Sequence, residues 1–206
     1  MKGNIIALIG PSGVGKNYLK SAIKKKFPEI KELTVLTTRP TRESDGIDRR
    51  AGLEEDYFLK EVKSGRIIAA HQPFADLGYW YGFSKEQIDY LLSKEETILT
   101  EVHVDNAEFF RKKYADKIVM IGVTAALDYL DKNIQERGSE AESERLIRLQ
   151  KAENENSIIK DLCSNKIVDK IFEASWENRE TLAGSVISEI ETLFRKPVFE
   201  EMKAFK

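Results

Sequence analysis

A glycine-rich segment near the start of the chain has the residue types and spacing that bind phosphate. It consists of Gly10, Pro11, Ser12, Gly13, Val14, Gly15, Lys16 and Asn17. Glycines allow consecutive backbone N–H groups to point at one anion, and the positive end of a following helix adds to the attraction. A lysine at position 16 can reach the terminal phosphates of a nucleoside triphosphate. The segment therefore predicts a phosphate-binding loop, or P-loop, for a nucleoside triphosphate.

The residue after the lysine departs from the usual P-loop pattern. Ser or Thr normally stands there, and its hydroxyl contacts Mg²⁺; this chain has Asn17. An amide oxygen can bind a hard cation directly or through water. Asn17 is therefore the candidate metal ligand, and Mg²⁺ is the expected metal ion. Glu101 can assist through water, although a surface carboxylate is the simpler expectation for it.

Four arginines could supply further positive charge for phosphoryl transfer. Arg39 and Arg42 follow a predicted strand, and Arg137 and Arg148 lie in a highly charged stretch. The planar guanidinium engages phosphate with two parallel hydrogen bonds. Each arginine alone is expected on the solvated surface, but the set sits at segment junctions that flank one predicted crevice. Together with Lys16 they are the candidate catalytic residues.

Length and composition limit the function classes. The chain has 206 residues, 41% hydrophobic and 33% charged, with a net charge of −2, which suits one soluble domain and gives no nucleic-acid signal. The single cysteine, Cys163, excludes an intrachain disulfide, and two histidines give a zinc site poor support. We find no membrane-length apolar run and no signal peptide. We expect a cytoplasmic enzyme, monomer or homodimer, acting on a small molecule without nucleic acid or membrane partners.

Apolar patterning predicts an α/β fold in which strands alternate with helices. An arrangement of this kind gives a parallel sheet covered by helices on both faces. The predicted strands are residues 5–9, 33–38, 67–74, 79–83, 98–104, 118–123 and 166–172. The predicted helices are residues 16–26, 53–62, 84–92, 105–114, 127–137, 140–162 and 182–194, and a tail follows residue 197 as a docked extension or a dimer contact.

Two inserted segments interrupt this alternation of strands and helices. Residues 67–74 and 79–83 form a predicted hairpin, so the insert around them should be antiparallel. The helix at 140–162 is heavily charged with few apolar anchors, and we expect it to be largely solvated and mobile. Both inserted segments should lie at the carboxyl ends of the strands, where open α/β sheets bind ligands.

Four motifs in the same order resemble those of the guanylate kinase family, P-loop kinases of nucleoside monophosphates, over nearly the whole chain. The P-loop is the first. The second is residues 37–42, Thr-Thr-Arg-Pro-Thr-Arg, followed by Asp-Gly at 45–46. The third is Tyr79-Trp80-Tyr81-Gly82, similar to the family's Tyr-Tyr-Gly motif. The fourth is the pair Arg137-Gly138 and Arg148-Leu149, at the spacing of the family's lid arginines.

The resemblance implies a three-layer P-loop kinase fold with a small antiparallel acceptor-binding insert and a helical lid. The core would be residues 1–36, 97–125 and 164–206, the insert 37–96 and the lid 126–163. Lys16 and the loop amides would bind the phosphates of ATP, and Arg39 and Arg42 the phosphate of the acceptor, to which Tyr81 donates. Arg137 and Arg148 would close over the transferring group. The implied reaction is conversion of GMP to GDP.

The guanine-reading positions differ from the family pattern. Where the family has Ser, Glu, Ser or Thr, and Asp, this chain aligns Val35, Ala69, Phe83 and His103. A family tyrosine that contacts the acceptor phosphate aligns with Arg49. Guanine presents N–H donors, and Val, Ala and Phe offer them no acceptor. The candidate acceptor-binding residues are Arg39, Arg42, Arg49, Tyr81 and His103.

Two alternatives therefore stay open. The chain also resembles ribose 1,5-bisphosphate phosphokinases, which share the fold, lack the guanine-reading Glu and can carry a polar residue at the position of Asn17. In a kinase for that sugar or for another nucleotide, Arg49 and Arg50 could bind the extra negative charge of the acceptor. The second alternative is a non-catalytic guanylate kinase-like binding module, which the presence of Lys16 disfavours.

Overall fold

A computed structural model describes residues 3–41, 49–73, 77–138 and 141–195. Its strands are β1 Ile5–Ile9, β2 Lys31–Glu32, β3 Val35–Thr37, β4 Arg49–Arg50, β5 Ile67–His71, β6 Tyr81–Ser84, β7 Ile98–Glu101, β8 Ile118–Ala125 and β9 Lys170–Ala174. Its helices are α1 Lys16–Lys26, α2 Glu55–Lys63, α3 Lys85–Ser93, η2 Val104–Asn106, α4 Ala107–Tyr114, η3 Ala115–Lys117, α5 Leu127–Arg137, α6 Glu142–Ser164 and α7 Leu182–Arg195.

The main sheet is parallel throughout and has the order β2-β7-β1-β8-β9. The central strand β1 is fully buried, as its unbroken apolar sequence predicts for a strand covered on both faces. The P-loop leaves the carboxyl end of β1 and leads into α1. The predicted strand and helix on either side of the loop are therefore confirmed.

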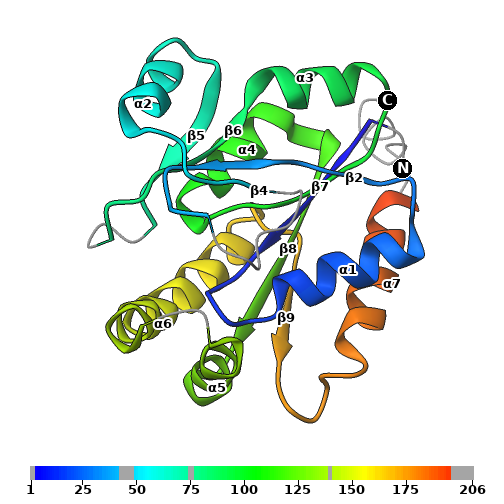
Figure 1. Cartoon of the computed structure of the whole chain (residues 1–206). Helices are drawn as coiled ribbons and strands as arrows, with labels where there is room; N and C mark the ends of the chain where they lie inside the picture. The colour runs from blue at the N-terminus through cyan, green and yellow to red at the C-terminus, as the bar shows by residue number, and fades with distance from the viewer. Residues whose placement is uncertain (1–2, 42–48, 74–76, 139–140, 196–206) are drawn as a thin grey trace.

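Helices cover both faces of this sheet, which makes three layers (Figure 1). Successive side chains of a strand point to opposite faces, so Ile6 and Leu8 pack toward α1 and α7, while Ile5, Ala7 and Ile9 pack toward α3, α4 and α6. The stripe predicted at residues 182–194 forms α7, with Val186 and Ile190 in the core. The predicted α/β architecture is confirmed.

A second sheet has the order β4-β3-β6-β5. Its β3–β6 and β5–β6 pairs are antiparallel, as expected for the hairpin insert, whereas β3 and β4 are parallel. The strand predicted at residues 33–38 is observed as β3 at 35–37, but it joins the second sheet, while the short β2 at 31–32 joins the main sheet. The β-branched sequence indicates extended backbone but not the strand with which it pairs.

Two helix starts illustrate how caps set the ends of elements. At α3, Ser84 Oγ accepts from the N–H of Gln87 at 3.2 Å, as in one half of a capping box. The Gln87 side chain bonds Thr34 instead of the Ser84 N–H: its amide oxygen accepts from the Thr34 N–H and its amide nitrogen donates to the Thr34 hydroxyl, both at 3.3 Å. At η2, His103 Nδ1 accepts from the Asp105 N–H at 3.3 Å, and the helical turn begins after His103.

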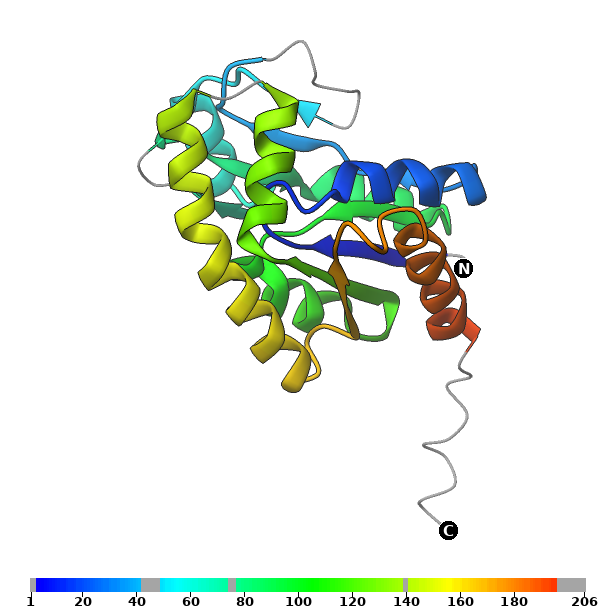
Figure 2. The same ribbon diagram turned by 90° about the horizontal axis from the view of Figure 1, so that it is seen from below.

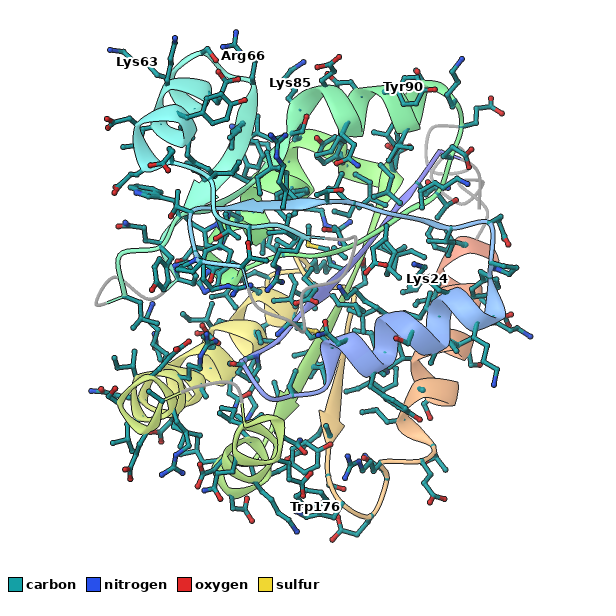
Figure 3. The ribbon with its side chains drawn as sticks, in the orientation of Figure 1. Lys24, Lys63, Arg66, Lys85, Tyr90 and Trp176 are labelled. Carbon is teal, nitrogen blue, oxygen red and sulfur yellow. The ribbon has the colours of Figure 1, made fainter. Side chains whose placement is uncertain are left out.

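Helices α5 and α6 run side by side at one end of the molecule (Figure 2). Helix α6 is far better anchored than its composition suggests, because Arg148, Ala152, Glu155, Ile159 and Leu162 are all buried. One face of α6 is therefore anchored in the protein, while its other residues are exposed or half-buried. The last strand lies at 170–174 rather than at 166–172. In the loop after it, Trp176 packs on Tyr129 of α5 with 4.6 Å between ring centres (Figure 3).

Some predicted features lie outside the described residues. They are Arg42 with the 42–48 segment, and the tail after residue 197. Arg137 ends α5, but its side chain is not described. Among the helices that are described, none is long and apolar enough to cross a membrane.

Candidate active site

The P-loop places the first turn of α1 beside the pocket. Gly13 and Gly15 have φ values of 85° and 99°, where residues with a Cβ are strained. A Cβ at Gly13 would also lie 2.8 Å from the carbonyl oxygen of Leu130 in α5. The N-cap residue of α1 is Gly15, which has no side chain to cap the helix, so the N–H groups of the first turn can bind an anion.

Lys16 lies at one end of a chain of alternating charges. Its Nζ is 2.7 Å and 3.0 Å from the carbonyl oxygens of Gly10 and Pro11, and 3.9 Å from Glu101 Oε2. The other oxygen of Glu101 is 3.0 Å from Lys20 Nζ. Glu32 then links Lys20 to Lys24: its Oε1 is 2.9 Å from Lys20 Nζ and its Oε2 is 2.8 Å from Lys24 Nζ. Lys24 lies on the outer side of α1 (Figure 3). These ion pairs keep the lysine ammonium groups of α1 in place next to the P-loop.

Glu101 is not the surface carboxylate that the sequence suggested. Its side chain is only 19% exposed and lines the same pocket as Lys16 and Asn17. Burial acts to raise the pKa of this carboxyl, but Lys16, Lys20 and Arg49 outweigh it and lower the pKa below its ordinary value. Glu101 is therefore a carboxylate at neutral pH.

The donors beside the P-loop fit magnesium chemically. Asn17 and Glu101 both line the pocket and offer an amide and a carboxylate oxygen, the ligand types that Mg²⁺ prefers. In the described part of the chain no three His, Cys, Asp or Glu side chains gather into a metal cluster. A site completed by ATP phosphates and water matches this donor set.

The arginines approach the pocket from both sides. Arg39 is 2% exposed, and its Nη1 donates to the carbonyl of Pro40 at 2.7 Å. Arg148 reaches from α6 to the P-loop, where its Nη1 donates to Ser12 Oγ at 3.0 Å. Glu144 holds that guanidinium from behind at 2.6 and 3.2 Å. Positive groups from separate parts of the chain thus converge on one space.

Arg49 has a buried donor without a partner. Residue 49 lies in β4 and lines the pocket, and its Nε has no hydrogen-bond partner among the described residues. A buried unsatisfied donor costs free energy, and this one would be satisfied by an anion in the pocket.

The far end of the pocket is apolar and aromatic, with two histidines. Val35 and Phe83 face each other across β3 and β6, and both line it. Tyr81 and His71 line it as well, with 6.0 Å between their ring centres. Ala69 does not line the pocket; its carbonyl accepts from Asn106 Nδ2 at 2.9 Å.

The imidazoles of His71 and His103 stack at 4.8 Å between ring centres. Asn106 Nδ2 lies 2.8 Å from His71 Nδ1. His103 Nε2 is 3.2 Å from Glu155 Oε1 of α6, and its Nδ1 is 3.2 Å from the exposed carboxylate of Asp105. Sequence analysis overlooked His71 and Glu155, although both line the pocket.

The pKa of His71 gives a testable dependence of stability on pH. Burial, with His103 and Lys151 beside it, lowers this pKa to about 4, against the raising effects of the Ala69 carbonyl and Asp105. The unfolded chain then binds more protons between pH 4 and about 6.5, so stability is lost as pH falls through that window.

We expect the free energy of unfolding to fall by about 1.4 kcal/mol per pH unit from this group across that window. His71→Gln should remove that part of the slope. Urea unfolding at pH 7, 6 and 5 measures it, and an unchanged slope in the variant would show that His71 does not carry it.

The structure brings most of the predicted site residues into one pocket. It is lined by Gly10, Ser12, Gly13, Gly15, Lys16 and Asn17 of the P-loop, and by Arg39, Arg49, Tyr81, His103 and Arg148. Of the positions aligned with guanine-reading residues, Val35, Phe83 and His103 line it. A phosphate loop, converging cations and a pocket for a second molecule suit transfer of a phosphoryl group between two bound ligands.

The chain is similar to known proteins over most of its length. Residues 2–181 match the family model described as guanylate kinase. A guanylate kinase of Synechococcus sp. (strain JA-3-3Ab) is 31% identical over 183 residues, which cover 88% of this chain and 82% of that protein. One from Thermotoga maritima is 29% identical, covering 74% of this chain and 72% of the relative. Guanylate kinase from Anaplasma phagocytophilum has a similar fold, with a TM-score of 0.64 at 19% identity over 94% of this chain and 85% of that chain.

Proposed function

Because the chain belongs to the guanylate kinase family, we propose that it transfers the γ-phosphoryl group of ATP to GMP. The observation that carries this proposal is one continuous pocket, shared by the P-loop, by Arg39 and Tyr81 of the insert and by Arg148 of α6. An oxygen of the GMP phosphate attacks the γ-phosphorus. The bond from that phosphorus to the β–γ bridging oxygen breaks, which yields ADP and GDP.

In this reaction the chain supplies position and charge. The amides of the P-loop and Lys16 bind the ATP phosphates, and Arg39 with Arg42 holds the acceptor phosphate, assisted by the Tyr81 hydroxyl. Arg137 and Arg148 would close over the transferring group, with residues 126–163 as a lid on a core of 1–36, 97–125 and 164–206. Mg²⁺ would be held by Asn17 and, through water, by Glu101, and it supplies positive charge to the phosphate oxygens.

Loss of Arg42 should affect the acceptor more than the donor. We expect Arg42→Ala to lower kcat/KM for GMP by about 10- to 100-fold, the effect of losing a charged hydrogen bond to phosphate. Background ATP hydrolysis should fall much less, since water needs no acceptor-phosphate site. Steady-state ADP release with and without GMP measures both, and equal losses would argue against this role.

A different acceptor is favoured by the buried Nε of Arg49, which has no hydrogen-bond partner in the part of the chain that the structure describes. With Arg50 next to it, this group suits an acceptor that carries a second phosphate, such as ribose 1,5-bisphosphate, or a different nucleotide. Val35 and Phe83 at the far end of the pocket offer no acceptor to the N–H donors of guanine.

One acceptor panel tests these proposals. Wild-type protein with Mg-ATP is given GMP, dGMP, AMP, UMP, IMP or ribose 1,5-bisphosphate, and ADP release is followed. Highest kcat/KM with GMP supports the main proposal, and a preference for the bisphosphate supports the second. No turnover with any acceptor and no ATP binding would indicate a non-catalytic binding module.

A further inference from the structure

A buried carboxylate faces the acceptor end of the pocket from helix α6. Glu155 is 7% exposed and lines the pocket beside His103. Its Oε1 is 3.2 Å from His103 Nε2. A carboxylate has two oxygens and about four lone-pair sites, so Glu155 can accept from a ligand in the pocket while it pairs with His103.

His103 holds this carboxylate in a fixed direction. A carboxylate oxygen only accepts, so His103 Nε2 carries a proton and donates to it. On its other side, His103 Nδ1 is 3.3 Å from the backbone N–H of Asp105, and His71 stacks on the ring at 4.8 Å. With the imidazole held at both nitrogens and one face, the carboxylate of Glu155 has a defined position beside the pocket.

Glu155 offers N–H donors a charged acceptor at this end of the pocket. Val35 and Phe83 are apolar, and Glu101 already pairs with Lys20 and Lys16. Guanine presents N1–H and a 2-amino group on one edge, which suit a carboxylate, whereas adenine presents an unprotonated N1 that a carboxylate repels. Val35 and Phe83 can pack against the faces of a purine ring.

We propose that Glu155, positioned by His103, reads the N1–H and 2-amino edge of the acceptor purine. This inference rests on the proposed GMP kinase function and names the group that gives it base specificity. Glu155 and Arg148 are seven residues apart, on one face of α6. The same helix therefore contacts the acceptor base and, through Arg148 and Ser12, the P-loop, so binding of the correct base also places the arginine.

The test compares Glu155→Gln with a matched control, Glu153→Gln, an exposed residue of the same helix. Kinetics are measured with Mg-ATP and GMP, IMP or AMP, together with the KM for ATP. We expect Glu155→Gln to lower kcat/KM for GMP by about 10- to 100-fold, the loss of a charged hydrogen bond, and AMP turnover not to fall with it. The GMP preference over AMP should collapse, while Glu153→Gln retains it.

A substrate-side measurement tests the same contact without a mutation. Binding of GMP and of its N1-methyl derivative to wild-type protein is measured by calorimetry, and we expect the methyl group to weaken binding at least about 10-fold. If Glu155→Gln keeps the GMP preference, or if GMP and its N1-methyl derivative bind equally well, Glu155 does not read the base, and the proposed kinase function is unaffected. Wild-type protein that ignores GMP but uses another acceptor overturns the proposed function itself, and this inference with it.

Discussion

Lys16→Ala is expected to lower phosphoryl transfer by about 100- to 1,000-fold with every acceptor, the loss typical of removing one charge-stabilising donor from a reacting centre. Lys16 is the P-loop cation, and its Nζ now lies on the loop carbonyls and 3.9 Å from Glu101. A bound phosphate offers full negative charge in place of those carbonyl dipoles, so we expect the ammonium group to turn toward it. Single-turnover transfer from ATP measures the loss.

The control for Lys16 is Lys25→Ala, which removes one exposed lysine from the same helix. It should leave transfer unchanged, and thermal unfolding of both variants should show that neither loses its fold. Because Lys16 serves the donor, its loss should be similar for GMP and for any other acceptor. Activity of Lys16→Ala near that of wild type would refute the P-loop assignment.

The P-loop could be predicted because its determinants are local. Glycines at 13 and 15, an apolar strand before them and a helix after them are adjacent in sequence, and the structure forms all three. The split between β2 and β3 could not be predicted in this way. Both segments are extended, and the choice of sheet depends on β7 and β6, more than 40 residues further along.

The spacing of its residues indicates that one face of α6 is buried, although the hydrophobicity of those residues does not. Its buried residues are 148, 152, 155, 159 and 162, with spacings of four, three, four and three, the period of one helix face. Two of the five, Arg148 and Glu155, are charged, so the face does not look apolar. They are buried because Ser12 and Glu144 pair with the arginine and His103 pairs with the glutamate.

Contacts between distant segments account for the site residues that sequence reasoning overlooked. Glu101 looked like a surface carboxylate because nothing near it in sequence indicates Lys20, which lies 3.0 Å away. His71 enters the pocket through a β5 strand whose register shifts between Ile68 and His71, with Ala69 at a φ of 52°. A backbone irregularity of this kind redirects side chains, and no alternating pattern predicts it.

Arg148→Ala is expected to lower kcat by about 1,000-fold while changing the KM for ATP only a few-fold, because an arginine over the transferring group acts mainly on the charge of the transition state. Arg148 is 8% exposed, contacts Ser12 of the P-loop and is held by Glu144, so it is already positioned beside the donor site. Arg148→Lys should restore little activity, because a single ammonium group lacks the planar pair of donors.

The matched control is Arg145→Ala, which removes one arginine from the same helix. Arg145 pairs with Asp131 of α5, and it is not among the residues that line the pocket. Its loss should reduce kcat far less than the loss of Arg148. Quenched-flow measurement of the chemical step separates loss of charge stabilisation from slower lid closure. A lid that merely closes more slowly delays binding or release and leaves the chemical step intact. Equal kcat values for the two variants would mean that α6 acts by packing, and that Arg148 does not stabilise the transferring group.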